Sequence, residues 1–195
     1  MLKLLNNPKS DNTRNILNAD LFVSNLHNTL KAFGFNPKVT YEVYRSITVY
    51  HITWNDDKIY DDILELKKEI ALSLGINVSE LVMNKVKDNE IFIKVDNMKK
   101  DILCLKEVLD NYKVDNDFKV VLGLDEYDKL VTFDFDKEKS LLVTGVSGTG
   151  KTNLFNDIIM NILINYSNVK VVILDSQGIN YNLYNDVCEV VNKEE

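Results

Sequence analysis

The chain has 195 residues, of which 45% are hydrophobic and 27% charged, and this composition excludes disordered, collagen-like and coiled-coil proteins. Lys and Arg total 23 against 30 Asp and Glu, so the net charge of −7 repels a phosphate backbone over most of the surface, and any contact with DNA requires a local patch. No apolar run approaches the roughly 18 residues of a membrane helix and the polar N-terminus has no signal-peptide core, which together predict a cytoplasmic protein.

The N-terminal part of the chain is predicted to combine helices with antiparallel strands. After a flexible segment at 1–19, apolar residues at helical spacing predict a helix over 20–33 that ends at a glycine. A stretch rich in Val, Ile, Thr and Tyr over 39–54 predicts a hairpin that turns near 44–46. The next apolar stripe predicts a single helix over 59–74, again followed by a glycine cap.

The middle of the chain is predicted to hold two more pairs of strands with a helix between them. Residues 81–95 form the first pair, joined at 87–89, and the apolar positions of 98–109 recur at helical spacing. Residues 118–135 form the second pair, which flanks the acidic turn 125–128.

The clearest chemical signal is a glycine-rich loop that matches the pattern GxxxxGK[ST], known as Walker A. It follows the apolar run 140–144, which is predicted to be a buried strand, and it precedes a helix with an apolar stripe. Glycines in such a P-loop let successive backbone N–H groups point at a phosphate, and the N-terminus of the helix adds its positive dipole end. The loop consists of Gly145, Val146, Ser147, Gly148, Thr149, Gly150, Lys151 and Thr152.

Two side chains of this loop have expected roles toward a nucleotide. Lys151 is expected to neutralise the β- and γ-phosphates of ATP, and the hydroxyl of Thr152 is expected to bind Mg²⁺. The alternative is a glycine-rich turn that matches the pattern by chance, which the predicted order of strand, loop and helix disfavours.

A second apolar run, 169–174, follows the helix and ends at Asp175. It predicts a parallel strand, which would complete a βαβ unit with 140–144. Asp175 could be read as a Walker-B carboxylate, but this strand is simply the next one after the P-loop helix. We therefore interpret Asp175 as a strand-end residue near the nucleotide or as a subunit contact.

The order of these features resembles the FtsK/SpoIIIE family of hexameric DNA-translocating ATPases over about residues 26–183. The resemblance implies an α/β chain with two parts. The first is an α+β domain of the family's alpha type at 20–135, and the second, at 136–195, is the first βαβ unit of a RecA-like P-loop NTPase parallel sheet. The segments that carry the resemblance are 39–43, 70–75, 91–97, 105–109, 121–125 and 141–145, together with Asp-Ser-Gln at 175–177 in place of the family's Asp-Pro-Lys.

The same resemblance implies ATP and Mg²⁺ as cofactors. It also implies a homo-hexamer or hetero-oligomer that acts on double-stranded DNA in chromosome segregation or DNA transfer and that partners recruit to the membrane. The chain ends soon after the P-loop, whereas a motor domain needs on the order of 150 further residues. We therefore expect a truncated or excised portion that lacks the Walker-B strand, the catalytic Glu and the arginine finger. Such a portion is expected to bind a nucleotide, and the sequence leaves open whether it also hydrolyses it.

Two alternatives to a translocase portion remain. One is a non-hydrolysing nucleotide-binding accessory protein that assembles with a full-length translocase. The other is a small P-loop kinase, which is disfavoured because the loop lies far from the N-terminus. The two histidines and the hairpin aromatics are assigned to packing, and Cys104 and Cys188 are read as small apolar residues because they form no CxxC motif.

Overall fold

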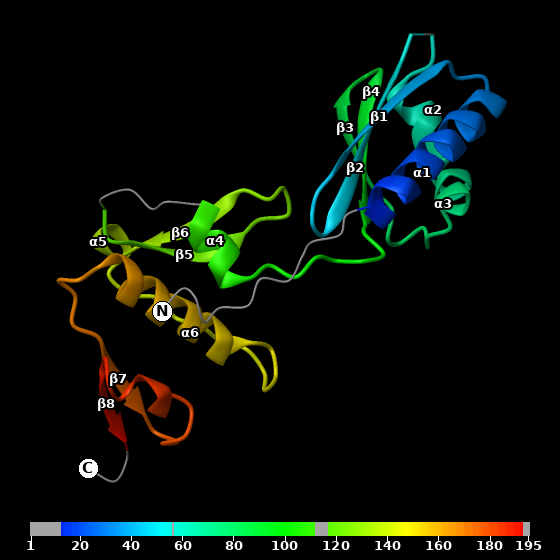
Figure 1. Cartoon of the computed structure of the whole chain (residues 1–195). Coiled ribbons are helices and arrows are strands. Elements are labelled where there is room, and N and C mark those ends of the chain that lie inside the picture. Colours follow the sequence, from blue (N-terminus) through cyan, green and yellow to red (C-terminus); the bar gives the residue numbers. More distant parts are fainter. Residues whose placement is uncertain (1–12, 56, 112–116, 193–195) are drawn as a thin grey trace. The chain divides into compact units, whose positions relative to one another are not determined.

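A computed structural model describes residues 13–55, 57–111 and 117–192 of the chain (Figure 1). These residues divide into two compact units, an N-terminal unit of residues 13–102 and 125–129 and a C-terminal unit of residues 103–124 and 130–192. Of the expected flexible segment 1–19, residues 1–12 lie outside the described residues, and the remainder belongs to the first helix, which begins at Thr13.

The N-terminal unit is built on an antiparallel four-stranded sheet in the order β1-β2-β4-β3. Alternate residues of the central strand β4 are buried, the pattern of a sheet with one covered face. Both strand pairs predicted in this part of the chain are confirmed, and the first pair turns at 44–46 as expected. The strands are β1 (Pro37–Val43), β2 (Ile47–Trp54), β3 (Val82–Lys87) and β4 (Glu90–Asp96).

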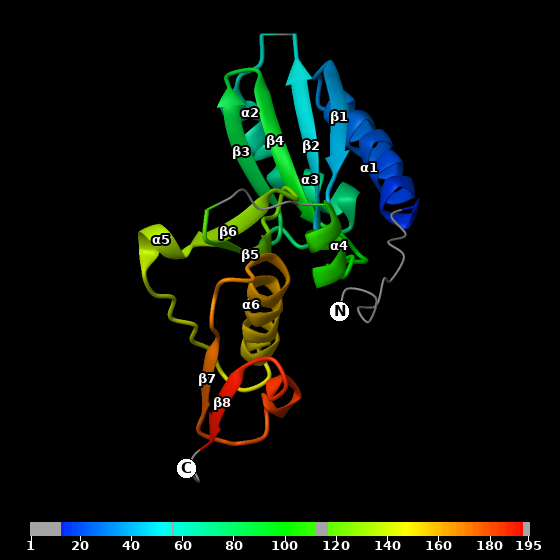
Figure 2. The ribbon, with the colours of Figure 1, turned by 60° about the vertical axis from the view of Figure 1, so that its left-hand side comes forward.

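Three helices cover one face of this sheet: α1 (Thr13–Ala32), α2 (Tyr60–Glu65) and α3 (Lys67–Leu74) (Figures 1 and 2). Gly34 and Gly75 have positive φ angles of 83° and 66°, which confirms both predicted glycine caps. The expected single helix over 59–74 is wrong, because the chain breaks at Leu66, whose side chain turns inward and packs against the core. That core includes Leu26, Leu30, Tyr50, Ile52, Trp54, Ile63, Ile70, Ile91 and Ile93.

The helix expected over 98–109 is confirmed only in its second half, as α4 (Leu105–Asn111). Met98 and Ile102, which supplied the start of the predicted stripe, have exposed fractions of 82% and 77%. The two units meet in sequence at 102/103, so this part of the chain connects them and has no core of its own to pack against.

The C-terminal unit begins with α4 and the predicted hairpin of β5 (Lys119–Leu124) and β6 (Leu130–Asp134), which is confirmed. A short helix α5 (Phe135–Glu138) follows, and then α6 (Lys151–Asn165), which begins where the sequence places it. Val120 of β5 packs in one cluster with Ile158 and Ile162 of α6. The structure thus groups both strands of the hairpin with the helix, whereas the sequence places the domain boundary after residue 135.

The end of the chain forms a small parallel sheet of β7 (Val172–Asp175) and β8 (Glu189–Asn192), joined through the short 3-10 helix η2 (Asn182–Tyr184) (Figure 2). Ile159 of α6, Ile173 and Tyr184 form its core. Residues 140–144 are not a strand, because among the described residues no neighbouring strand pairs with them, and Leu142 is 86% exposed. The chain is a mixed α/β protein as expected, although the parallel pair within the described residues is β7 with β8.

Candidate functional site

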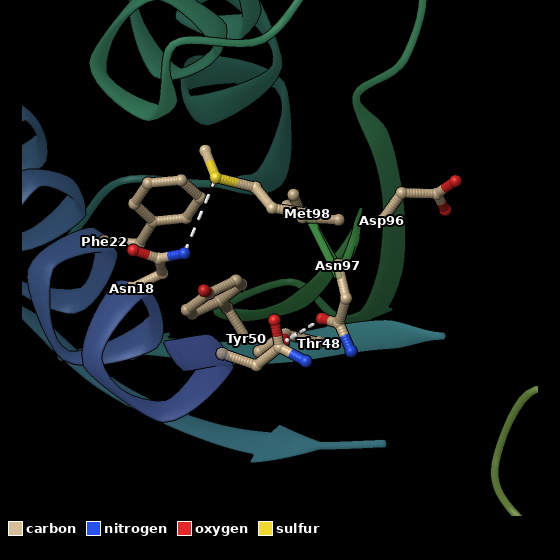
Figure 3. Close-up of a pocket in the computed structure, with 9 residues that line it drawn as sticks. Asn18, Phe22, Thr48, Tyr50, Asp96, Asn97 and Met98 are labelled. Carbon is tan, nitrogen blue, oxygen red and sulfur yellow. Dashed lines mark hydrogen bonds between the residues drawn. The ribbon is translucent and has the colours of Figure 1, made fainter. Parts of the chain in front are cut away.

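The N-terminal unit contains a small pocket between α1 and the sheet, shown in Figure 3. Its volume is about 20 Å³, and the Thr48 hydroxyl donates a hydrogen bond of 2.7 Å to the side-chain oxygen of Asn97 at its edge. A cavity of this size holds about one water molecule. The pocket therefore is not a candidate ligand site.

The C-terminal unit contains a larger pocket, of about 610 Å³, at the N-terminus of α6. This volume lies in the range of small-molecule binding sites. Much of its lining comes from the predicted phosphate loop, and the rest comes from the start of α6 and from the segment after β7. The lining residues are Ser147, Gly148, Gly150, Lys151, Thr152, Asn153, Gln177 and Asn180.

The backbone of the 145–152 loop requires its glycines. Gly148 and Gly150 have φ angles of 81° and 91°, in the left-handed region that side chains other than glycine rarely adopt. A Cβ atom at Gly145 would lie 2.8 Å from the hydroxyl oxygen of Thr149, which donates a hydrogen bond of 2.8 Å to the carbonyl of Val146. The loop is thus curled tightly enough that the first glycine cannot be replaced without a shift.

The ammonium group of Lys151 lies against the backbone of the 145–152 loop. It donates hydrogen bonds of 2.7 Å to the carbonyl oxygens of both Gly145 and Val146. The first intrahelical bond of α6 runs from the Leu154 N–H to the Gly150 carbonyl, so the N–H groups of the preceding helical residues have no acceptor within the helix. The positive charge of Lys151 and the N–H groups at the start of α6 therefore lie close together, and this combination suits the binding of an anion.

The segment after β7 is organised by Asp175, which is only 5% exposed. Its carboxylate accepts hydrogen bonds from the backbone N–H of Gln177, at 3.1 Å, and of Asn180, at 3.0 Å. Its carbonyl accepts from the N–H of Gly178, which closes a tight turn with aspartate first and glycine last. The carboxylate thus holds the 176–180 loop and does not line the pocket.

These contacts set the protonation of Asp175. Burial raises the pKa of its carboxyl, but the hydrogen bonds from the loop backbone, with those of Asn180 and Gln177 the largest, together outweigh burial and lower the pKa below its ordinary value. A carboxyl with a lowered pKa stabilises the folded loop above the ordinary value of about 3.9, and this stabilisation is lost as the pH falls through the folded-state pKa.

We predict that Asp175→Asn loosens the 176–180 loop at neutral pH, because a neutral amide oxygen is a weaker acceptor than a carboxylate. Hydrogen exchange of the Gln177 and Asn180 amides should become several-fold faster, and acidification should no longer change their protection. Asp186→Asn is the matched control, because Asp186 is exposed in the same segment. Equal exchange in both variants would contradict this account.

Three pocket residues were not predicted from the sequence: Asn153, which directly follows the predicted loop, and Gln177 and Asn180. Gln177 and Asn180 follow the carboxyl end of β7, and the side-chain amide of Asn180 donates a hydrogen bond of 2.9 Å to the side-chain oxygen of Gln177. The sequence signal was the apolar run that ends at Asp175, which marks this strand end, but nothing in it shows which side chains face the loop. Thr152, the predicted magnesium ligand, lies in the first turn of α6 and does line the pocket.

No group of three or more His, Cys, Asp and Glu side chains among residues 13–55, 57–111 and 117–192 is arranged to hold a metal ion. None of the helices in those ranges is both long and apolar enough to cross a membrane.

Comparison with known proteins gives matches over nearly the whole chain. Residues 105–194 match the model of the FtsK/SpoIIIE family. The chain is 32% identical over 190 residues to the DNA translocase FtsK of Staphylococcus aureus (strain MRSA252) and 28% identical over 198 residues to that of Clostridium tetani, in both cases over 95% of its length. It spans about a quarter of these relatives, 24% and 26% of their lengths.

One solved structure resembles the chain with a TM-score of 0.41 and 15% sequence identity. It is the pCW3 conjugation coupling protein TcpA in a monomer form with ATPγS. The similarity covers 87% of this chain and 49% of that protein.

Proposed function

Because this chain belongs to the FtsK/SpoIIIE family, we propose that its 145–152 loop binds ATP and that the chain is the nucleotide-binding portion of a DNA translocase. One observation carries the proposal: the loop, the N-terminus of α6 and the Lys151 ammonium surround a single pocket of about 610 Å³. Backbone N–H groups and a lysine around one hollow suit the phosphates of a nucleotide.

Calorimetric titration of the chain with ATP in the presence of Mg²⁺ tests this proposal directly. We expect saturable binding at one site per chain, and ADP should compete for it. Binding of neither nucleotide would contradict the proposal, because the described loop already has the curled backbone that phosphate binding needs.

The residues around the pocket fit a Mg²⁺ ion that is carried mainly by the nucleotide. Thr152 lies in the first helical turn, where its hydroxyl can supply one ligand, and Mg²⁺ commonly keeps several waters and phosphate oxygens beside few protein ligands. The carboxylate of Asp175 is engaged with backbone N–H groups. Thr152 is accordingly the protein ligand that we assign to the ion.

We predict that Thr152→Val, which removes the hydroxyl and keeps the shape, weakens binding of ATP by about tenfold when Mg²⁺ is present. The affinity measured in excess EDTA should be unchanged, because no metal is then bound. Thr144→Val is the control, since Thr144 is exposed and does not line the pocket. An equal loss of affinity with and without Mg²⁺ would refute the metal role.

The partner of the complete assembly is proposed to be double-stranded DNA, in segregation or transfer of DNA by a homo-hexamer or hetero-oligomer in the cytoplasm. The name of the curated relatives, DNA translocase, supports this part of the proposal. The excess of 30 acidic over 23 basic residues gives the chain little long-range attraction for DNA. We therefore assign DNA contact to the assembly, and we assign the N-terminal unit to the domain that precedes the motor in this family.

A further inference from the structure

The pocket at the N-terminus of α6 has a second wall that the phosphate-loop pattern does not include. Gln177 and Asn180 line it from the loop after β7, whereas the other lining residues come from 147–153. Two segments about 25 residues apart in the sequence therefore face one hollow.

This second wall is held in place by a buried group. Asp175 is 5% exposed, and its carboxylate accepts hydrogen bonds from the backbone N–H groups of Gln177 and Asn180, which both line the pocket. Gly178 between them has a φ angle of 70°, which lets the chain turn back toward the pocket. The backbone is therefore held in place at both residues whose amide side chains line the pocket.

The hydrogen bond between the two amides decides which atom is available to a ligand. Asn180 donates its amide hydrogen to the side-chain oxygen of Gln177. The acceptor end of Gln177 is thereby engaged, and its –NH₂ group is the end that can donate to another molecule. A fixed N–H donor in a pocket that also holds an ammonium group suits an oxygen of a phosphate.

We propose that the 176–180 loop is the second wall of the nucleotide site and that Gln177 donates a hydrogen bond to the terminal phosphate of a nucleoside triphosphate. The 145–152 backbone surrounds the inner phosphates, so a group on the opposite wall meets the outermost one. Asp175 is then a positioning residue, which acts through the loop backbone. The inference rests on the proposed function, because it assumes that the pocket takes a nucleotide.

The test introduces a charged side chain at position 177 and measures how the affinities for ADP and for an ATP analogue change. In Gln177→Glu the new carboxylate repels the terminal phosphate, so affinity for a non-hydrolysable ATP analogue should fall about tenfold, while affinity for ADP should change less than about threefold. Gln177→Lys should tighten binding of the analogue by a similar factor. Both affinities are measured by calorimetry with Mg²⁺ present.

Ser176→Glu and Ser176→Lys are the matched controls. They add the same charges one residue earlier, on an exposed side chain that does not line the pocket. We expect both to stay within about twofold of the unmodified chain for either nucleotide. The inference is overturned if Gln177 and Ser176 variants behave alike, or if Gln177→Glu weakens ADP as much as the ATP analogue.

One further variant separates this inference from the proposed function. If Lys151→Ala weakens both nucleotides while the Gln177 variants do not discriminate between them, the nucleotide site stands and the second wall is wrong. If the unmodified chain and Lys151→Ala bind both nucleotides equally, the proposed function itself fails.

Discussion

Replacing Lys151 by alanine is expected to weaken binding of MgATP by at least about tenfold, equivalent to roughly 1.4 kcal/mol. The ammonium group lies over the loop, 2.7 Å from two of its carbonyl oxygens, at the place where phosphates would enter. Its removal leaves the phosphate charge facing carbonyl oxygens without a cation between them. Alanine keeps the first turn of α6, because it is the best helix former.

The measurement is a calorimetric titration of the variant with MgATP at fixed salt concentration. Lys170→Ala is the control, because Lys170 has a 76% exposed side chain that pairs with Glu189, away from the pocket lining. It removes the same charge from the same unit, so any general electrostatic effect appears in both variants. An unchanged affinity in Lys151→Ala would show that this loop does not hold the phosphates.

The features that the sequence predicts well are those set by neighbouring residues. The antiparallel strand pairs, the left-handed caps at Gly34 and Gly75 and the start of α6 after Gly150 all follow from local patterns of side-chain type and backbone freedom. The glycine-rich loop belongs to the same class, because its curl depends on glycines within eight consecutive positions.

The features that the sequence does not predict depend on contacts between distant segments. The break at Leu66 arises because its side chain packs into a core built from other elements. Residues 140–144 have the composition of a strand, but a strand also needs a hydrogen-bonding neighbour, and no neighbour pairs with them among the described residues. Likewise, Gln177 enters the candidate site only because the loop that Asp175 holds faces the 145–152 loop.

The second large effect is expected in the core of the N-terminal unit. Ile70 of α3 is fully buried, so Ile70→Ala should lower the free energy of unfolding of this unit by about 3 kcal/mol, through lost burial and the cavity left behind. Leu72 lies two residues away on the same helix and is 81% exposed. Leu72→Ala should therefore change stability by less than about 0.5 kcal/mol.

The single tryptophan makes this comparison specific to one unit. Trp54 is 1% exposed in the same core, and its indole N–H donates a hydrogen bond of 2.8 Å to the carbonyl of Lys58. Unfolding of the N-terminal unit moves the indole into water, so urea titration followed by tryptophan emission reports on this unit. Equal midpoints for Ile70→Ala and Leu72→Ala would mean that α3 does not pack into the core of this unit through Ile70.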